Sequence, residues 1–260
     1  MKKLELIREQ ISQCDDKIIN ALVERMNYIE EVISYKKENG VPILQPEQEE
    51  RQLTALLAKL KENQYKEEIL DTFSSIVKNS KKVQAKVLFS YNIMLIGFMG
   101  TGKSTVSDYL GEMLAMEQIE MDALIVEKEG MSIAKIFEEY GEEYFRNCES
   151  NTLIELQKKN HAVVSCGGGV VLRDENIKYM KKKGRIVLLT ANPETIYGRV
   201  KDSIERPILN NNMNIGFISE LMEKRRERYE MAADIIINTD SKSIRLICEE
   251  LIGKLTAMET

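Results

Sequence analysis

A glycine-rich motif follows a short apolar run near the middle of the chain and limits the folds that the chain can adopt. The run Ile93-Met-Leu-Ile96 leads directly into Gly97-Phe-Met-Gly-Thr-Gly-Lys-Ser104, and apolar residues then recur at helical spacing from Val106 to Leu114. A buried strand, a glycine loop and a helix N-terminus are therefore expected in succession. Backbone N–H groups and the positive end of a helix bind phosphate groups in such a loop. The motif predicts a nucleoside triphosphate site rather than a plain glycine turn.

The polar residues of this loop have separate expected roles. Lys103 would reach the outer phosphates, and the hydroxyl of Ser104 would ligate Mg²⁺. The predicted triphosphate-binding residues are Gly100, Thr101, Gly102, Lys103, Ser104 and Thr105.

Composition and charge exclude several classes of protein. The 260 residues carry a net charge of −5 with acids and bases interspersed, which argues against nucleic-acid binding. No apolar run approaches the roughly 20 residues of a membrane span, and the first residues lack the apolar core of a signal peptide. The four cysteines show neither metal-ligand spacing nor a pairing pattern, so reduced thiols are expected. We expect a soluble, cytoplasmic protein without a nucleic-acid or membrane partner.

The first ninety residues show helical periodicity and no strand pattern. Apolar residues recur at helical spacing from Leu4 to Ile33, which predicts one helix from about residue 4 to residue 38. Such a helix is roughly 50 Å long, too long to bury its apolar stripe within ninety residues of one chain. A second copy of the chain is its expected partner. Two further helices are predicted, from Pro46 to about Glu62 and from about Ile69 to Phe89.

Several polar residues in this region share a helix face. Arg25 and Lys36 fall on one stripe, since 11 residues are close to a whole number of turns, whereas Arg8 points about 100° away from Arg25. Ser80 and Gln84 form an i, i+4 pair. Taken singly, each of these residues is more typical of the solvated surface of a charged helix bundle, because most Lys, Arg and Glu side chains are solvated.

Taken together, the polar positions match a known pattern. The run Leu6-Ile7-Arg8-x-x-Ile11-x-x-x-Asp15, followed by Leu22-Val-Glu-Arg25, Lys36, Pro42-Ile43 and Glu49, resembles the all-helical chorismate mutase family. The resemblance implies a helical homodimer in which each long helix contributes to two active sites. The reaction of this family is pericyclic and needs no nucleophile or proton transfer. The enzyme only has to hold the substrate in its reactive conformation and place hydrogen-bond donors at the oxygen that gains negative charge.

The resemblance also implies a role for each matched residue. Arg25 and Arg8 of the partner chain would bind the two carboxylates of chorismate, a task that suits bidentate guanidinium groups. Lys36 and Gln84 would donate to the ether oxygen. Gln45 and Gln48 depart from the Asp and Arg often found in the family, so an inactive dimerisation or regulatory domain stays an alternative. The implied chorismate-binding residues are Arg8, Arg25, Lys36, Gln45, Glu49, Ser80 and Gln84.

From Asn92 onward, short β-rich runs alternate with helical stretches. This alternation predicts a parallel sheet with helices on both faces. Ser90-Tyr91-Asn92 separates the two patterns, so we expect a helical domain over residues 1–90 and an α/β domain over residues 91–260. The expected strands include Ile93–Ile96, Ala162–Ser165, Ile186–Leu189 and Ile235–Asn238, with a further strand ending near Glu120.

The α/β part also matches a known family. After the phosphate loop come Glu120-Met-Asp122, Gly141-Glu-Glu-Tyr-Phe-Arg146, the triple glycine 167–169, Arg206-Pro-Ile-Leu and Arg225-Arg-Glu-Arg-Tyr229. This series closely resembles shikimate kinase in order and spacing. The resemblance implies ATP and Mg²⁺ as co-substrate and cofactor. A different small-molecule kinase is disfavoured, because a neutral sugar does not require two arginines for a carboxylate.

Each element of this series has an implied role. Arg146 and Arg225 would bind the carboxylate of shikimate, and Asp122 would accept the proton of the reacting hydroxyl. Gly167, Gly168 and Gly169 would let the backbone approach the ring.

Other residues have roles implied toward Mg²⁺ and ATP. Glu120 stands where the family usually has an Asp near Mg²⁺, and Glu120 and Ser104 are the predicted Mg²⁺-binding residues. Arg206, in a mobile lid over about residues 200–217, would stabilise the transferring charge, and Arg199 would stack on adenine.

The leading hypothesis is a bifunctional enzyme of the aromatic amino-acid pathway, with shikimate kinase and chorismate mutase activities. The two reactions are not consecutive, so channelling is not expected. The alternative is a kinase with an inactive helical domain that serves dimerisation or regulation.

Overall fold

The chain divides into two compact units in the computed structural model, which describes residues 2–39, 41, 46–201 and 214–258. The first unit spans Met1–Leu88 and the second spans Phe89–Thr260. None of the described helices is long and apolar enough to cross a membrane.

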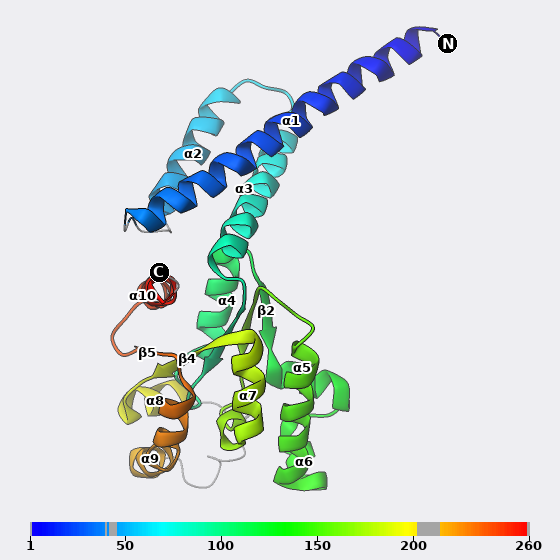
Figure 1. The fold of residues 1–260 in the computed structure, drawn as a ribbon. Helices are drawn as coiled ribbons and strands as arrows, with labels where there is room; N and C mark the ends of the chain where they lie inside the picture. Colours follow the sequence, from blue (N-terminus) through cyan, green and yellow to red (C-terminus); the bar gives the residue numbers. More distant parts are fainter. Residues whose placement is uncertain (1, 40, 42–45, 202–213, 259–260) are drawn as a thin grey trace. The chain divides into compact units, whose positions relative to one another are not determined.

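The described part of the first unit is helical (Figure 1). Helix α1 spans Lys2–Glu38, α2 spans Pro46–Lys59 and α3 spans Lys66–Leu88, and α1 packs mainly against α3. α2 ends before the predicted Glu62. The side-chain oxygen of Asn63 accepts a hydrogen bond from the backbone N–H of Tyr65 (2.8 Å), a local bond that favours a turn over further helix.

The apolar side chains in the first half of α1 lie on its surface. Leu4, Ile7, Ile11 and Ile18 are 54%, 43%, 55% and 56% exposed. Among the described side chains of this unit, the buried ones are Ile33, Leu60, Ser80, Ala85 and Leu88. So few buried residues do not make a core that covers a helix of this length.

A parallel five-stranded sheet forms the centre of the second unit, in the order β2-β3-β1-β4-β5. β1 pairs with β3 and with β4, and every strand pair is parallel. The predicted α/β class is confirmed. The strands are β1 Asn92–Ile96, β2 Glu117–Glu120, β3 Ala162–Ser165, β4 Gly184–Thr190 and β5 Ile235–Asn238.

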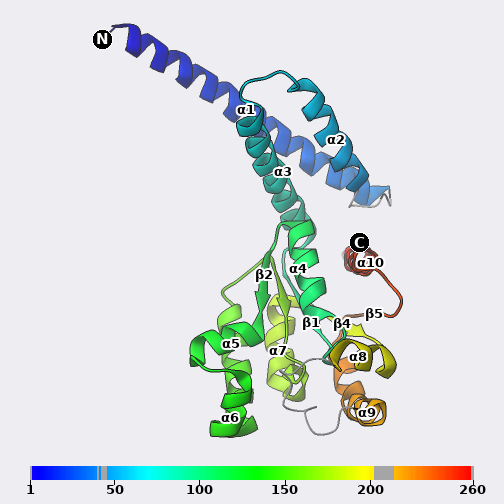
Figure 2. The ribbon, with the colours of Figure 1, turned by 180° about the vertical axis from the view of Figure 1, so that it is seen from behind.

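Helices cover both faces of this sheet, as Figures 1 and 2 show from opposite sides. α4 packs against α10 on one face, and α7 and α9 contact β4 on the other. The helices are α4 Lys103–Leu114, α5 Met121–Glu129, α6 Ile133–Leu156, α7 Asp174–Lys183, α8 Pro193–Val200, α9 Ile215–Ala232 and α10 Ile244–Ala257, with a 3₁₀ turn η1 at Val170–Leu172.

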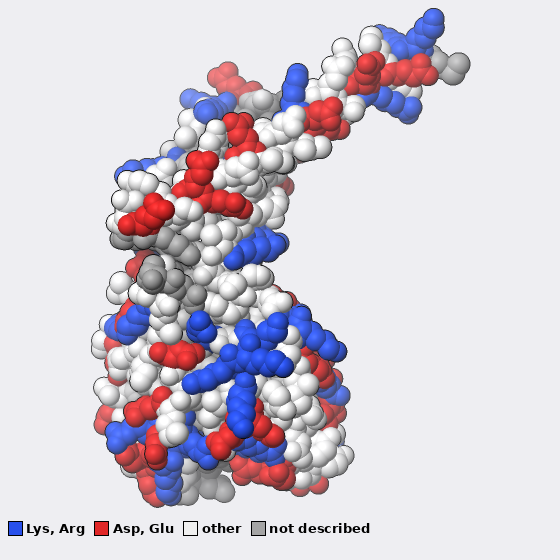
Figure 3. Space-filling view, viewed as in Figure 1, with Lys and Arg blue, Asp and Glu red and all other residues white. Residues whose placement is uncertain are grey.

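Buried apolar runs hold the sheet between these layers. All five residues of β1 are buried, as are all four of β3, which is typical of parallel strands covered on both faces. Lysine and arginine side chains gather where α7 ends (Figure 3). Lys181, Lys182 and Lys183 form its last turn, where cations complement the negative end of the helix dipole.

Candidate active site

The carboxyl ends of β2, β3 and β1 lie side by side, and a functional segment follows each of them. Ser165 at the end of β3 pairs with Leu95 of β1 on one side and with Glu120 of β2 on the other. Ligands of open parallel sheets bind at this edge. The sheet therefore brings the glycine loop, the acidic Glu120 segment and the triple glycine to one place.

The loop after β1 has the backbone of a phosphate-binding loop. Gly97 has φ +144°, and a Cβ there would lie 2.3 Å from the carbonyl oxygen of Leu189, so only glycine fits. Lys103 begins α4, and its ammonium group donates to the carbonyls of Gly97 (3.0 Å) and Phe98 (3.2 Å). The lysine thus lies over the loop that would hold the phosphates.

Two carboxylates lie at the carboxyl end of β2. Glu120 ends this strand and Asp122 lies in the first turn of α5. Burial raises the pKa of the Glu120 carboxyl, and the nearby hydroxyls of Ser104 and Ser165 oppose this rise. The Oε2 atom of Glu120 is buried without a hydrogen-bond partner in the described chain. A buried carboxylate oxygen beside a hydroxyl is a donor set that suits a hard cation.

Arg146 of α6 packs directly against the triple glycine. Its guanidinium donates to Glu149 (2.6 Å) and to Glu142 (2.7 Å), and the Glu149 side chain is fully buried. A Cβ on Gly169 would lie 2.1 Å from Nη1 of Arg146. A Cβ on Gly167 would lie 2.6 Å from Glu149 Oε1 and 3.0 Å from an oxygen of Asp122. The glycines therefore lie between the two acids and the arginine.

α9 reaches the same turn from the other side. Arg225 Nη1 donates to the carbonyl of Gly168 (3.4 Å), and the hydroxyl of Tyr229 donates to the same oxygen. Tyr229 is buried, which raises its pKa to about 12 and keeps it a donor at neutral pH. Arg146 and Arg225 thus converge on one glycine turn beside Asp122.

Arg199 at the end of α8 is tied to the phosphate loop. It donates to the carbonyl of Gly100 (3.1 Å) and to the hydroxyl of Thr239 (3.1 Å), and that hydroxyl donates to the carbonyl of Thr101 (3.2 Å). Arg206 and most of the expected lid lie outside the described residues.

The helical unit brings together some of the predicted chorismate-binding residues. Arg25 of α1 donates to the hydroxyl of Ser80 of α3. Lys36 is half-buried, and burial lowers its pKa. Arg8 lies 17 positions before Arg25 on α1, which is about 25 Å along the axis. Gln45 lies outside the described residues. Glu49 belongs to α2, but its side chain is not among those described.

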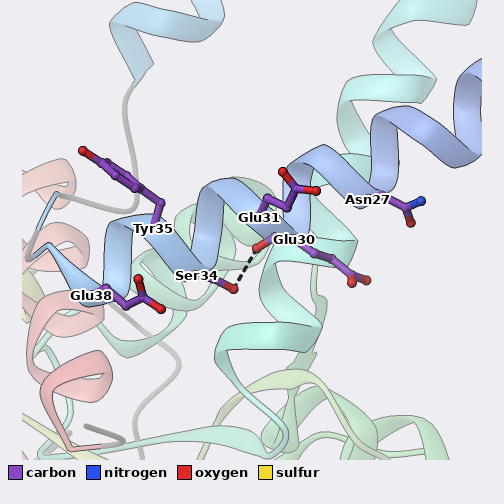
Figure 4. A pocket seen from close by; sticks show the side chains of 6 residues that line it. All are labelled: Asn27, Glu30, Glu31, Ser34, Tyr35 and Glu38. Atoms are coloured by element: carbon purple, nitrogen blue, oxygen red, sulfur yellow. Dashed lines mark hydrogen bonds between the residues drawn. The ribbon is translucent and has the colours of Figure 1, made fainter.

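A hollow of about 630 Å³ lies along another face of α1 (Figure 4). The charged residues that line it are all acidic, so it does not suit a substrate with two carboxylates. It is lined by Asn27, Glu30, Glu31, Ser34, Tyr35 and Glu38.

Two protein families match this chain. Residues 99–256 match the family model of Shikimate kinase, and residues 7–85 match that of Chorismate mutase type II. The chain belongs to the shikimate kinase family. Its other matched segment gives it a chorismate mutase type II domain, so the predicted combination of two enzyme domains is confirmed. Membership of the kinase family implies the use of ATP.

Relatives of known sequence and structure match the kinase domain. The shikimate kinase of Dehalococcoides mccartyi (strain 195) is 40% identical over 168 residues, which are 65% of this chain and 95% of that protein. That of Sulfurihydrogenibium sp. is 42% identical over 164 residues, 63% and 97% of the two chains. The structure of shikimate kinase from Acinetobacter baumannii in complex with shikimate superposes with a TM-score of 0.64 at 30% identity and covers 67% of this chain and 98% of its own.

Sequence reasoning assigned no role to two residues that the kinase site contains. Glu149 is the ion-pair partner of Arg146, three residues further along the same helix, and Tyr229 lies one turn after Arg225. Spacing alone could have pointed to both, because i, i+3 and i, i+4 residues share a helix face. Their burial could not be deduced from the sequence.

Proposed function

We propose that the chain carries two separate active sites, one in residues 91–260 that phosphorylates the 3-hydroxyl of shikimate and one in residues 1–90 that rearranges chorismate to prephenate. The convergence of Arg146 and Arg225 on the glycine turn beside Asp122 supports the first most directly. Two guanidinium groups at one turn suit a carboxylate, and a carboxylate next to them suits a hydroxyl that must lose a proton.

In the kinase site, each residue has a defined task. Asp122 accepts the proton of the reacting hydroxyl, and Lys103 moves from the loop carbonyls to the outer phosphates of ATP. Gly167, Gly168 and Gly169 line the shikimate ring. Arg206 neutralises charge on the transferring group. Gly100, Thr101, Gly102, Ser104 and Thr105 hold the phosphates, with Arg199 at the adenine side.

Ser104 and Glu120 would hold Mg²⁺. The unpartnered buried oxygen of Glu120 fits this role, since a buried carboxylate atom requires a charged or hydrogen-bonding partner. When bound, Mg²⁺ would neutralise negative charge on the phosphate oxygens of ATP. Glu120 would carry its carboxylate one methylene further than the usual Asp and would still supply an oxygen near the ion.

In the mutase site, the stripe that faces α3 binds chorismate. Arg25 and the partner's Arg8 bind the two carboxylates. Lys36 and Gln84 donate to the ether oxygen, and Glu49 accepts from the ring hydroxyl. Ser80 holds Arg25 in place through the hydrogen bond described above. Gln45 completes the proposed set.

The helical unit forms the homodimer. The exposed stripe of α1 supports this proposal, since large apolar side chains at this density require cover. Antiparallel packing that places Arg8 opposite the partner's Arg25 also places Leu4 opposite the partner's Ile29 and Ile11 opposite the partner's Leu22. Each of these pairs unites an exposed apolar residue with a partly exposed one. The stripe is therefore self-complementary in this register, as a two-fold axis requires.

Parallel assays on one preparation test the two sites. Purified full-length protein should release ADP only when both ATP and shikimate are present, and it should consume chorismate without ATP. Asp122→Asn should remove the first activity and spare the second. If the protein phosphorylates shikimate but leaves chorismate unchanged, the helical domain only dimerises or regulates the kinase. Gln45→Asp combined with Gln48→Arg, which introduces the residues often found in the family, would then be the first test for recovery of the mutase activity.

A further inference from the structure

Behind the guanidinium of Arg146 lies a chain of hydrogen bonds between buried polar side chains. Asn176 in the first turn of α7 is fully buried, and Ser150 of α6 is 7% exposed. The amide nitrogen of Asn176 lies 3.0 Å from the carbonyl oxygen of Val170, and its amide oxygen lies 2.7 Å from the Ser150 hydroxyl. Arg173 Nη1 lies 3.3 Å from the same hydroxyl.

The chemistry of these groups fixes the direction of each bond. The carbonyl of Val170 can only accept, so the amide nitrogen of Asn176 faces it and the amide oxygen faces Ser150. That oxygen also can only accept, so Ser150 gives it its single hydroxyl hydrogen; this contact is shorter than the 3.1 Å contact of Ser150 with the carbonyl of Arg146. Ser150 then accepts from Arg173. The relay runs from Arg173 through Ser150 and Asn176 to Val170.

The two ends of this relay hold the two sides of the Arg146 pocket. Val170 directly follows Gly169, against which the Arg146 guanidinium packs. Ser150 lies one turn after Arg146 on α6. Arg173 adds bonds to Asn147 (2.8 Å) and Glu143 (2.5 Å), which flank Arg146 on the same helix. The relay therefore sets the separation between α6 and the glycine turn.

We propose that Ser150 and Asn176 are positioning residues for shikimate binding, because they hold Arg146 at the distance from Gly169 that lets it bind the substrate carboxylate. The proposal rests on the proposed role of Arg146. A small change in this separation moves the planar guanidinium of Arg146 away from a bidentate contact with the substrate carboxylate. Loss of the relay should therefore weaken the binding of shikimate and leave the binding of ATP unchanged.

Steady-state kinetics of the full-length protein test the relay. Ser150→Ala leaves the amide oxygen of Asn176 buried without its donor, and we expect the KM for shikimate to rise about tenfold, with the KM for ATP and kcat changed by less than about twofold. Ser150→Thr keeps the hydroxyl and should restore the KM for shikimate. Ser107→Ala is the matched control, since the Ser107 hydroxyl is buried on α4 without a partner among the described residues.

An unchanged KM for shikimate in Ser150→Ala, with a lowered thermal midpoint, would show a purely structural role and overturn the proposal. Arg146→Lys separates this failure from that of the proposed function. If Arg146→Lys leaves the KM for shikimate unchanged, Arg146 does not bind the carboxylate and both proposals fail. If Arg146→Lys raises it and Ser150→Ala does not, the relay alone is wrong.

Discussion

The carboxylate of Glu149 lies 2.6 Å from a guanidinium nitrogen of Arg146, and its side chain has no exposed surface. Burial raises the pKa of this carboxyl to about 6 from an ordinary value of 4.5, and the attraction of Arg146 only partly offsets the rise. Glu149 therefore changes protonation in a pH range where most carboxyls of the chain stay ionised.

This pKa predicts a pH dependence of stability. A carboxyl whose folded-state pKa is raised binds its proton more tightly in the folded state, so its contribution is fully present below about pH 4.5 and is lost as the pH rises through about 6. Glu149→Gln removes this dependence. Between about pH 5 and pH 7.5, the unfolding free energy of the wild type relative to this variant should fall by about 1 kcal/mol, as measured by urea unfolding.

Glu142→Gln serves as the control for this measurement. Glu142 also binds Arg146, but its side chain is 60% exposed. This variant keeps Glu149, so the difference in unfolding free energy between it and the wild type should stay the same over this pH range. A parallel pH response of Glu149→Gln and the wild type would show that another group causes the dependence.

The close approach of Gly169 to Arg146 predicts a substrate-specific defect. In Gly169→Ala the new Cβ would lie 2.1 Å from Nη1 of Arg146, so the arginine must move. The KM for shikimate should rise at least about tenfold, because one bidentate contact to the carboxylate is lost, while the KM for ATP stays the same. Steady-state kinetics with each substrate varied in turn give both values.

Gly198→Ala provides a comparison at a site without close neighbours in the described part of the chain. Gly198 lies in α8, and a Cβ there meets nothing within 4 Å among the residues that the structure describes. It should leave both KM values unchanged and raise stability by about 0.5–1 kcal/mol, because alanine favours helix. If Gly169→Ala also left the KM for shikimate unchanged, Arg146 would not be a shikimate ligand.

The sequence predicted the fold of the second unit better than the side-chain contacts of its site. Strands β3 and β5 begin and end where the apolar runs predicted, since buried parallel strands are continuous in apolar residues. The interruption of α6 was not predicted: Gly141 has φ 80° and ψ 174° inside the helical run. A glycine in a helix-forming segment can either continue the helix or interrupt it. The packing of the residues before and after the glycine decides between the two, and the sequence alone does not give that packing. The Ser150–Asn176 bond joins residues from different elements, so no local spacing reveals it.

A variant of the helical unit should separate the two activities. Lys36→Ala removes the proposed donor to the ether oxygen of chorismate, where negative charge develops during the rearrangement. Chorismate turnover should fall about 10²–10³-fold, the usual effect of losing one such donor. ADP release with shikimate should stay at the wild-type rate. Equal loss of both activities in a protein with unchanged circular dichroism would contradict separate sites.

The exposed stripe of α1 predicts that one charge disrupts the dimer. Ile11→Asp places a carboxylate where the stripe would be covered, and an unpaired buried charge is costly. Sedimentation should show mainly monomer. Chorismate mutase activity should also be lost, because the proposed site takes Arg8 from the partner chain. Gln13→Asp adds the same charge about 200° around the helix and should stay dimeric.

The proposed antiparallel register makes a prediction about distances across the dimer. A Cys14→Ser background removes the exposed native thiol, and the other three cysteines are buried. In this background, Ile11→Cys combined with Leu22→Cys should form covalent dimers with a bismaleimide linker of about 8 Å, because the two positions face each other across helices about 8–10 Å apart. Within one chain the same positions are about 16 Å apart along α1, beyond the reach of the linker.

The control combines Ile11→Cys with Ile29→Cys. In the proposed register position 29 lies about two turns away from the point opposite the partner's Ile11, so this pair should give few covalent dimers. Equal yields from the two pairs, or the reverse order, would show that Arg8 does not reach the partner's Arg25, and the second carboxylate of chorismate would then need another ligand.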